Sequence, residues 1–265
     1  MTSPPNPFVD PDGEPRLAPC ALLFVDLLGV SAMAEADEAQ RNLTELARVL
    51  RGTYRDFLRP DSPWPAAMFS DTLVVASPLG GDDLGAAETA TGGLIIQAAW
   101  LQLNLAMEGY SLRGGLTVGL AHLHDGLVFG PALVEAYQLE QRRAIHPRIV
   151  LGQAAADVQR DALRFYAEPA DSPQNLLLAV DQDGNLFIDY LALLVDEPDD
   201  LPPGVADHAG VVAAKVDQHR GDSRRWDNYR WVAEYHNAFC ARHLPDEPGL
   251  VVDVEASDRR FGRLV

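Results

Sequence analysis

The chain alternates short apolar runs with longer segments in which apolar residues recur every three or four positions. The run ALLFVDLLG, residues 21–29, is short and ends in glycine, which predicts a buried strand. Residues 37–59 carry apolar side chains at helical spacing, and Pro60 ends this predicted helix. In residues 66–77 two apolar pieces flank a Ser-Asp dipeptide, which predicts a tight hairpin.

The pattern continues with a long helix predicted at residues 84–108 and a strand at 111–123. The Asp125-Gly126 dipeptide predicts a turn into another short strand, and Pro131 stands where a helix can begin. A strand is predicted in PRIVLG after this helix. The order predicts an α+β fold, an antiparallel sheet with a βααββαβ (ferredoxin-like) core and helices packed on it.

We expect three parts along the chain. Residues 1–17 are polar and Pro-rich, which predicts a flexible N-terminal arm, and residues 18–195 form the main domain. Residues 176–191 predict one more hairpin within that domain. Residues 196–265 predict an acidic linker, over 196–210, and a C-terminal helical extension, over 211–243. The extension carries an aromatic stripe suited to core or dimer contacts, namely Trp231, Tyr235 and Phe239.

Charge limits the partners of the chain. It has 39 acidic and 21 basic residues and a net charge of -18, which disfavours binding to nucleic acid and to anionic membranes. Cys20 and Cys240 form no motif, which indicates reduced thiols. The N-terminus lacks a signal-peptide pattern, and the most apolar helical stretch is shorter than the roughly 20 residues of a membrane span. We therefore expect a cytoplasmic protein that does not insert into a membrane.

Two aspartates stand in apolar surroundings. Asp26 interrupts the first predicted strand, and Asp71 lies inside MFSDTLVVAS. An ionised carboxylate buried without a partner costs several kcal/mol, so each must be exposed, paired or bound to a cation. Singly, Asp71 could be a turn residue and Asp26 a helix cap. Together they favour a divalent cation, because neighbouring carboxylates repel each other and a cation removes that repulsion.

The segment after Asp26 suits a phosphate. Gly29, Val30 and Ser31 lie at a strand-to-helix junction, where free backbone N–H groups and the helix dipole favour an anion. An ordinary helix cap by Ser31 explains the same residues, and both interpretations stay open.

These motifs resemble those of class III nucleotide cyclases. The segment FVDLLGVS, residues 24–31, resembles the first-strand motif, and FSDT, residues 69–72, resembles the hairpin with the second metal aspartate. RGGLTVG, residues 113–119, resembles the following strand, and the run from VFGPAL at residue 128 to Leu139-Glu140 resembles the segment that enters the last core helix. The sequences of these motifs are most similar to those of the bacterial pyrimidine cyclases of anti-phage Pycsar systems. Those proteins also share a Tyr-His-Asn helix, here residues 235–237.

The departures from purine cyclases agree with that branch. The base-reading lysine is missing, because the matching region is Ala66-Ala67-Met68. Alignment on Gly130 places Val134 and Gln138 where purine cyclases carry an asparagine and an arginine. The transition-state cation is therefore unassigned, and Arg113 is the first candidate, with Arg142, Arg143 and Arg148 behind it. The alternatives are a strand-edge ion pair for Arg113 and a solvated helix end for Arg142 and Arg143.

The resemblance implies a homodimer that converts UTP, or less favourably CTP, to the 3′,5′-cyclic monophosphate with two Mn²⁺ or Mg²⁺ ions. The implied metal ligands are Asp26, Asp71 and the Leu27 backbone carbonyl. The implied substrate contacts come from the junction residues already named and from Tyr54, Ser70 and Thr72. The product would act on a separate effector protein in antiviral defence. The alternatives are a purine cyclase and a catalytically dead nucleotide sensor.

Three other features have simpler explanations. Tyr54 continues the apolar stripe of its helix, so core packing competes with a contact to the base. His122 and His124 share one face of a strand and suit two satisfied or exposed histidines better than a metal pair. Asp181 and Asp183 in DQDGN indicate a hairpin turn, because the other acidic positions of a calcium loop are absent.

Overall fold

The computed structural model describes residues 6–30, 33, 35, 41–59, 62–195, 201–255 and 258–265. Within these residues nine strands form one sheet in the order β2-β3-β1-β4-β6-β8-β7-β9, with β5 paired to β4. The strands are β1 Ala18–Leu27, β2 Ala66–Phe69, β3 Thr72–Pro78, β4 Leu112–His124, β5 Leu127–Phe129, β6 Ile149–Leu151, β7 Leu178–Asp181, β8 Leu186–Ile188 and β9 Phe261–Arg263. All their pairings are antiparallel except the parallel pair β4 and β6.

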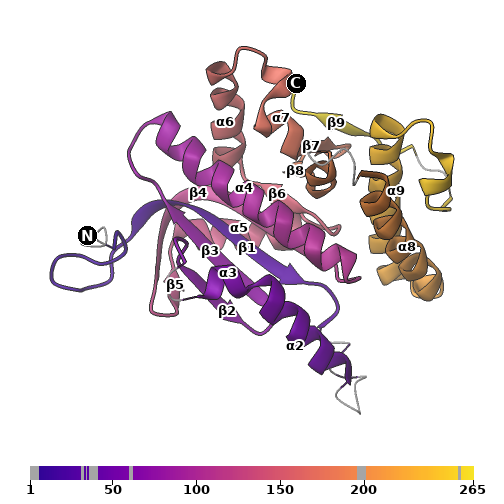
Figure 1. The fold of residues 1–265 in the computed structure, drawn as a ribbon. Helices are drawn as coiled ribbons and strands as arrows, with labels where there is room; N and C mark the ends of the chain where they lie inside the picture. Colours follow the sequence, from indigo (N-terminus) through magenta and orange to yellow (C-terminus); the bar gives the residue numbers. More distant parts are fainter. Residues whose placement is uncertain are drawn as a thin grey trace.

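Helices cover both faces of this sheet (Figure 1). They are α2 Arg41–Thr53, α3 Arg55–Leu58, α4 Leu84–Met107, α5 Pro131–Arg142, α6 Gln153–Ala162, α7 Pro173–Leu177, α8 Leu201–His219 and α9 Ser223–His243. Short 3-10 helices, η1 Leu163–Phe165, η2 Pro169–Asp171, η3 Tyr190–Leu194 and η4 Pro248–Leu250, connect them. The predicted α+β class and the β-α-β-β-α-β order of the core, from β1 to β4, are both confirmed.

The alternation of β1 divides the core into two layers. Ala21, Leu23, Val25 and Leu27 pack with α2 and α4 in the larger apolar cluster. Cys20 and Leu22 point to the other face, where α5 contributes Ala132 and Ala136 to a second cluster. Successive side chains of a strand point to opposite faces, so Phe24 and Asp26 also belong to the α5 face.

The N-terminal segment from residue 6 packs on this second cluster. Phe8 is fully buried there, and its ring meets His122 edge to face at 6.2 Å between centroids. His122 Nδ1 lies 3.2 Å from the carbonyl oxygen of Arg16, and the Asn6 amide lies 2.9 Å from His124 Nδ1. Residues 6–17, which composition places in a flexible arm, thus bury an aromatic side chain that the local polarity of the segment conceals. The two histidines of β4 hold this segment.

The C-terminal part contributes to the same sheet. Strand β9 pairs with β7, and α8 packs beside α9 at one side of the molecule (Figure 1). Helix α8 begins at Leu201, inside the stretch expected to be a linker, because prolines are tolerated in the first turn of a helix. A break at residues 220–222 separates α9 from α8, where one helical region was expected. The proposed domain boundary at residue 195 stays a prediction.

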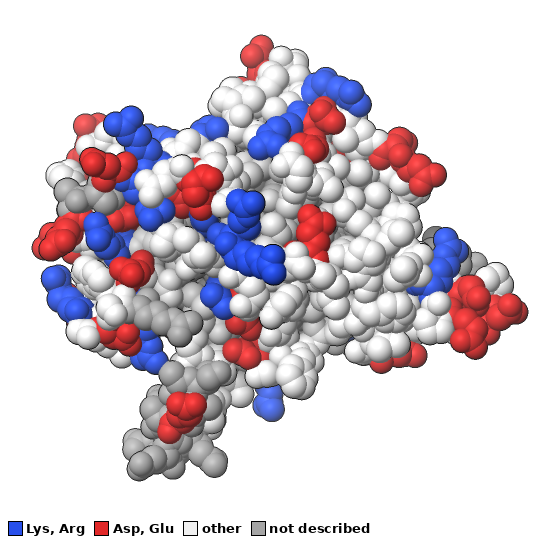
Figure 2. All heavy atoms as spheres, turned by 180° about the vertical axis from the view of Figure 1, so that it is seen from behind, with Lys and Arg blue, Asp and Glu red and all other residues white. Residues whose placement is uncertain are grey.

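Acidic and basic side chains are interspersed on the surface. Figure 2 shows one face on which most Lys and Arg side chains stand beside Asp or Glu side chains. Several ion pairs on the surface join side chains one helical turn apart, such as Arg48–Glu45 and Arg220–Asp217. No helix in the described part of the chain is both long and apolar enough to cross a bilayer.

Candidate functional site

A row of polar side chains crosses the three central strands. In the antiparallel register Asp26, near the end of β1, stands opposite Thr72 on β3 and opposite Arg113 on β4. Side chains that are directly opposite in a sheet share one face, so all three belong to the α5 side. The structure therefore brings together three of the residues that the sequence proposed separately.

Helix α5 lies over this row because β4 carries glycine beneath it. A Cβ atom on Gly115 would collide with the carbonyl oxygen of Ala136, so a larger residue would push the helix away. Arg113 is two residues from Gly115 and shares its face. Glu140 follows Ala136 by one helical turn, and it contacts Arg113 as an ion pair. Its side chain is only 1% exposed, against 21% for Arg113.

Asp26 experiences opposing electrostatic effects. The Thr72 hydroxyl donates a hydrogen bond of 2.9 Å to Asp26 Oδ1. Burial raises the pKa of Asp26 above its ordinary value, and the charge of Asp71 raises it further, while Thr72 and Arg113 lower it. Asp71 follows Ser70 in the β2–β3 turn, where Ser70 has a positive φ of 56°. The two carboxylates are thus electrostatic neighbours, as the sequence pattern predicts.

The charges of this site suit a cation. Asp26, Asp71 and Glu140 bring three acidic groups, while Arg113 is the one positive group that acts on both Asp26 and Glu140. No group of three or more potential metal-binding side chains occurs among the described residues. Two carboxylates fit Mg²⁺ or Mn²⁺, because such ions complete their shells with water, backbone carbonyls and substrate phosphates. A leucine side chain has no ligand atom, so the backbone carbonyl is the only group that Leu27 could offer to an ion.

The strand-to-helix junction has a tight turn. Leu28 N–H donates to the Ser111 carbonyl at 2.8 Å, and Gly29 has a φ of 89°, which favours glycine. Val30 is the first helical residue, and Met33 N–H donates to the Gly29 carbonyl at 2.9 Å. Gly29 and Val30 therefore lie just beyond the end of β1 that carries Asp26. Ser31 lies outside the described residues, so its proposed role is a prediction only.

Tyr54 packs in the core, as its helical spacing predicts, and its contact to the base stays a prediction. It is fully buried in the larger core cluster, at the break between α2 and α3. Its buried hydroxyl has no hydrogen-bond partner among the described residues. Burial raises the pKa of Tyr54, and the charges of Asp26 and Asp71 raise it further, which indicates that its hydroxyl lies within electrostatic reach of both carboxylates. The ring packs in the core while the polar end is close to the site.

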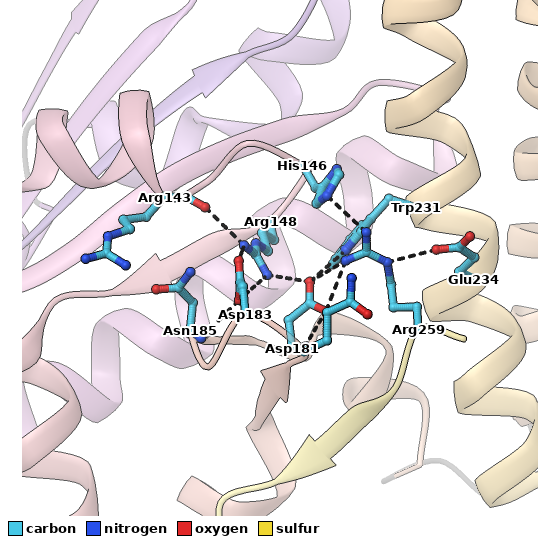
Figure 3. A network of polar contacts seen from close by, with 10 residues as sticks. Arg143, His146, Arg148, Asp181, Asp183, Asn185, Trp231, Glu234 and Arg259 are labelled. Carbon is cyan, nitrogen blue, oxygen red and sulfur yellow. Dashed lines mark hydrogen bonds and ion pairs between the residues drawn. The ribbon is translucent and has the colours of Figure 1, made fainter. Parts of the chain in front are cut away.

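Of the other candidate arginines, Arg148 has a structural role (Figure 3). Its side chain is fully buried and pairs with Asp181 at 2.5 Å and with Asp183. Its Nη2 also donates to the Arg143 carbonyl at 3.0 Å. Arg142 and Arg143 have exposed side chains at the end of α5, as expected for a solvated helix end.

The same network joins the β7–β8 turn to the C-terminal residues. Asp181 also accepts hydrogen bonds from Trp231 Nε1 at 2.9 Å and from Arg259 Nη1 at 3.0 Å (Figure 3). Arg259 Nε in turn donates to Glu234 at 2.9 Å. Asp181 and Asp183 do flank a hairpin turn, and their carboxylates act as counter-ions for buried arginine. Trp231 and Tyr235 are buried and stack at 5.5 Å, which supports a core role for the aromatic stripe.

Glu140 ends the motif run that begins at Val128, but the motifs assigned it no role in the site. A signal for it exists in the sequence, because Ala132, Ala136 and Glu140 follow each other at intervals of four on one face of α5. Two of these are small apolar residues suited to close packing. A carboxylate on such a stripe must have a positive partner, and Arg113 is that partner.

Comparisons with known proteins gave structural matches alone. No family model matches the chain, and neither does any curated protein. Among solved structures, the adenylyl cyclase CyaB from P. aeruginosa is 15% identical over 65% of this chain and 94% of its own, with a TM-score of 0.44. A bacterial light-regulated adenylyl cyclase is 12% identical over 69% and 99%, with a TM-score of 0.42. The guanylate cyclase domain of RhGC from Catenaria anguillulae, solved with GTP, is 11% identical over 64% and 93%, with a TM-score of 0.41.

At such identities the likeness concerns the fold, so chemistry must be assigned from this chain's own side chains. The chain is structurally similar, at low sequence identity, to class III adenylyl and guanylyl cyclase domains.

Proposed function

We propose that this chain is a nucleotide cyclase that converts a pyrimidine nucleoside triphosphate, UTP in preference to CTP, to the 3′,5′-cyclic monophosphate and pyrophosphate. One observation carries the proposal. Asp26 stands between Thr72 and Arg113 in the central strands, with Asp71 close enough to raise its pKa. Carboxylates for a divalent cation and an arginine for a phosphate thus meet at one end of the sheet.

The residues of the chain have distinct roles in this proposal. Asp26, Asp71 and the Leu27 carbonyl would hold the divalent ions, and Thr72 orients Asp26 through its hydrogen bond. Two such ions, when bound, would neutralise the triphosphate and lower the pKa of the ribose 3′-hydroxyl. Arg113 stabilises the negative charge that moves onto the leaving pyrophosphate.

The remaining substrate contacts come from two turns and one tyrosine. The backbone N–H groups of Gly29, Val30 and Ser31 bind phosphate oxygens, and Ser70 lines the exposed hairpin turn. The Tyr54 hydroxyl, which has no hydrogen-bond partner within the described part of the chain, offers a hydrogen bond to the nucleotide. A hydrogen bond between the nucleotide and this buried hydroxyl would recover the free energy that desolvation of the hydroxyl costs.

The reaction needs no covalent intermediate. The ribose 3′-oxygen attacks the α-phosphorus in line, the bond from the α-phosphorus to the bridging oxygen of the β-phosphate breaks, and the hydroxyl proton passes to solvent. Arrangement of the reacting groups and compensation of charge supply the rate enhancement.

The choice of a pyrimidine rests on what the site lacks and on the motif resemblance. Ala66 and Ala67 on β2 offer no cationic side chain to a purine, and Val134 on α5 is 54% exposed where purine cyclases carry a polar residue. In the pyrimidine branch the product activates a separate effector in anti-phage defence. We extend the pyrimidine substrate and the separate effector to this chain, and we propose that it is a cytoplasmic homodimer. Sedimentation velocity would detect the homodimer as twice the 28.8 kDa mass of one protomer.

Two alternatives have their own support. The solved structures to which the chain is similar include cyclases that act on purines, so an adenylate or guanylate cyclase with different base contacts is the second enzyme candidate. Val134 and Gln138, in place of the expected asparagine and arginine, favour a catalytically dead nucleotide sensor. Retention of both aspartates and of Arg113 favours an enzyme.

The test is incubation of the purified full-length chain with ATP, GTP, CTP and UTP separately, each with Mn²⁺ and then with Mg²⁺, and identification of products by mass spectrometry. We expect a cyclic monophosphate and pyrophosphate in equal amounts, chiefly from UTP. Product from ATP or GTP alone would contradict the pyrimidine assignment. Nucleotide binding with no product in any of the eight mixtures would favour the sensor.

A further inference from the structure

Glu140 is a charged side chain in a place that normally excludes charge. It is 1% exposed on α5, and burial raises its pKa above the ordinary value. Its Oε2 accepts a hydrogen bond from the Gln141 amide at 2.6 Å, and its Oε1 contacts Arg113 Nε. A buried carboxylate has to be compensated, and Arg113 provides the compensation.

The contact uses one edge of the Arg113 guanidinium. Glu140 approaches the Nε atom, although the N–H is not aligned well enough for a regular hydrogen bond. Neither terminal nitrogen of Arg113 donates a hydrogen bond to any described residue. The fork formed by those two nitrogens is the part of arginine that binds phosphate oxygens in pairs. The ion pair with Glu140 thus holds the Arg113 guanidinium and leaves its two terminal nitrogens available to bind phosphate.

Glu140 also fixes where that edge lies. Arg113 stands opposite Asp26 in the register, and the charge of Asp26 raises the pKa of Glu140, so the three groups lie within electrostatic reach. Helix α5 is held close to β4 at Gly115, which limits how far Glu140 can move. Without Glu140, the flexible Arg113 side chain would be free to turn toward Asp26 itself and compete with a cation there.

We propose that Glu140 is a positioning residue, which holds Arg113 by its Nε so that the two terminal nitrogens stay directed to the triphosphate beside Asp26. This inference rests on the proposed function for the identity of the ligand. The class of ligand that it requires is a polyphosphate carried by a divalent cation.

The test compares Glu140→Gln with the wild type and with Glu135→Gln, which makes the same change of charge on the same helix. Binding of Mn²⁺ and of Mn²⁺ with 3′-deoxy-UTP, which cannot cyclise, is measured by titration calorimetry. We expect Glu140→Gln to weaken nucleotide binding about tenfold, because the negative charge that holds the Arg113 guanidinium in an ion pair is lost. Binding of Mn²⁺ alone should stay within about twofold of the wild type, and Glu135→Gln should behave as the wild type.

A second comparison separates positioning from folding. In an Arg113→Met background the buried Glu140 carboxylate has lost its positive partner, so adding Glu140→Gln should raise the melting temperature and cause no further loss of nucleotide affinity. Additive losses, or wild-type affinity in Glu140→Gln alone, would overturn the inference. A wild-type chain that binds 3′-deoxy-UTP but makes no cyclic product from UTP contradicts the proposed function and leaves this inference standing. A wild-type chain that binds no nucleotide overturns both.

Discussion

At the scale of single residues, the hydroxyl of Thr72 acts directly on Asp26, the proposed metal ligand. It donates to Asp26 Oδ1 at 2.9 Å, and it is the main effect opposing the rise in the pKa of that carboxyl. A hydrogen bond to a metal-binding carboxylate fixes its orientation and keeps it ionised. Thr72 therefore contributes to the site although it need not touch the ion.

Replacing Thr72 by valine removes this hydrogen bond and keeps the shape of the side chain. We expect Thr72→Val to weaken Mn²⁺ binding about tenfold at neutral pH, within the range known for residues that orient metal ligands. The free energy of unfolding should change by only about 1 kcal/mol, because the lost hydrogen bond is partly exposed. Calorimetric titration with Mn²⁺ measures the first effect, and Thr72→Ser, which keeps the hydroxyl, should bind as the wild type does. Equal binding by the valine and serine variants would contradict this role.

At the scale of elements, a chain of hydrogen bonds joins α8 to α9. His236 Nε2 lies 2.8 Å from the Leu250 carbonyl, which can only accept, so this nitrogen carries the hydrogen. His236 Nδ1 then accepts from His208 Nδ1 at 3.0 Å, and His208 Nε2 accepts from the Tyr190 hydroxyl at 3.0 Å. The hydrogen-bond pattern thus assigns both histidines as neutral, with defined tautomers.

This arrangement makes the stability of the helix pair depend on pH. Burial, together with the neighbouring His236, lowers the pKa of His208 to about 3, while an unfolded histidine titrates near 6.5. Between these values the unfolded chain binds more protons, so the stabilisation is complete above pH 6.5 and is lost as the pH falls below it.

We expect His208→Gln to reduce this loss by about 1.4 kcal/mol per pH unit between pH 6 and pH 5. Urea unfolding at several pH values measures the slope. His124→Gln, which removes a more exposed histidine on β4, is the control. An unchanged slope in His208→Gln would show that His208 is not a buried neutral histidine.

The elements also show what the sequence can predict. The strand around Asp26, the hairpin with Asp71 and helix α4 follow from local periodicity, because each buries a face that the pattern of side chains already defines. Helix α6 was not predicted, since QAAADVQRDA carries mostly small residues and no strong apolar stripe. The ion pair of Arg148 with Asp181 joins residues 33 positions apart and depends on the pairing of strands, which local pattern does not specify.

In the site too, local sequence pattern does not specify contacts between residues on different elements. The motifs pointed to the pair Asp26 and Asp71 and, separately, to Arg113, and the register of β1 and β4 places Asp26 directly opposite Arg113. Glu140 was overlooked because its partner lies on another element, 27 positions before it in the chain. Tyr54 showed helical spacing, and only the packed structure reveals that no described residue forms a hydrogen bond with its hydroxyl.

At the scale of the whole molecule, the sheet connects the proposed catalytic part with the C-terminal helices. Strand β9 pairs with β7, and Arg259 joins Asp181 to Glu234 across that junction. A net charge of -18 would repel a nucleoside triphosphate from most of the surface. Productive binding therefore needs local positive charge, which the divalent ions and Arg113 provide in this account.

The most direct test of the central claim is to replace Asp26 by asparagine, with Asp125→Asn in the distant β4–β5 turn as the matched control. We predict that Asp26→Asn folds with an unchanged or higher melting temperature, because it removes a charge that burial and Asp71 disfavour. Mn²⁺ affinity and formation of cyclic nucleotide should both fall at least about a hundredfold, while Asp125→Asn keeps wild-type values. If Asp26→Asn folds and retains Mn²⁺ binding and turnover, Asp26 is not a metal ligand and the proposed mechanism is wrong.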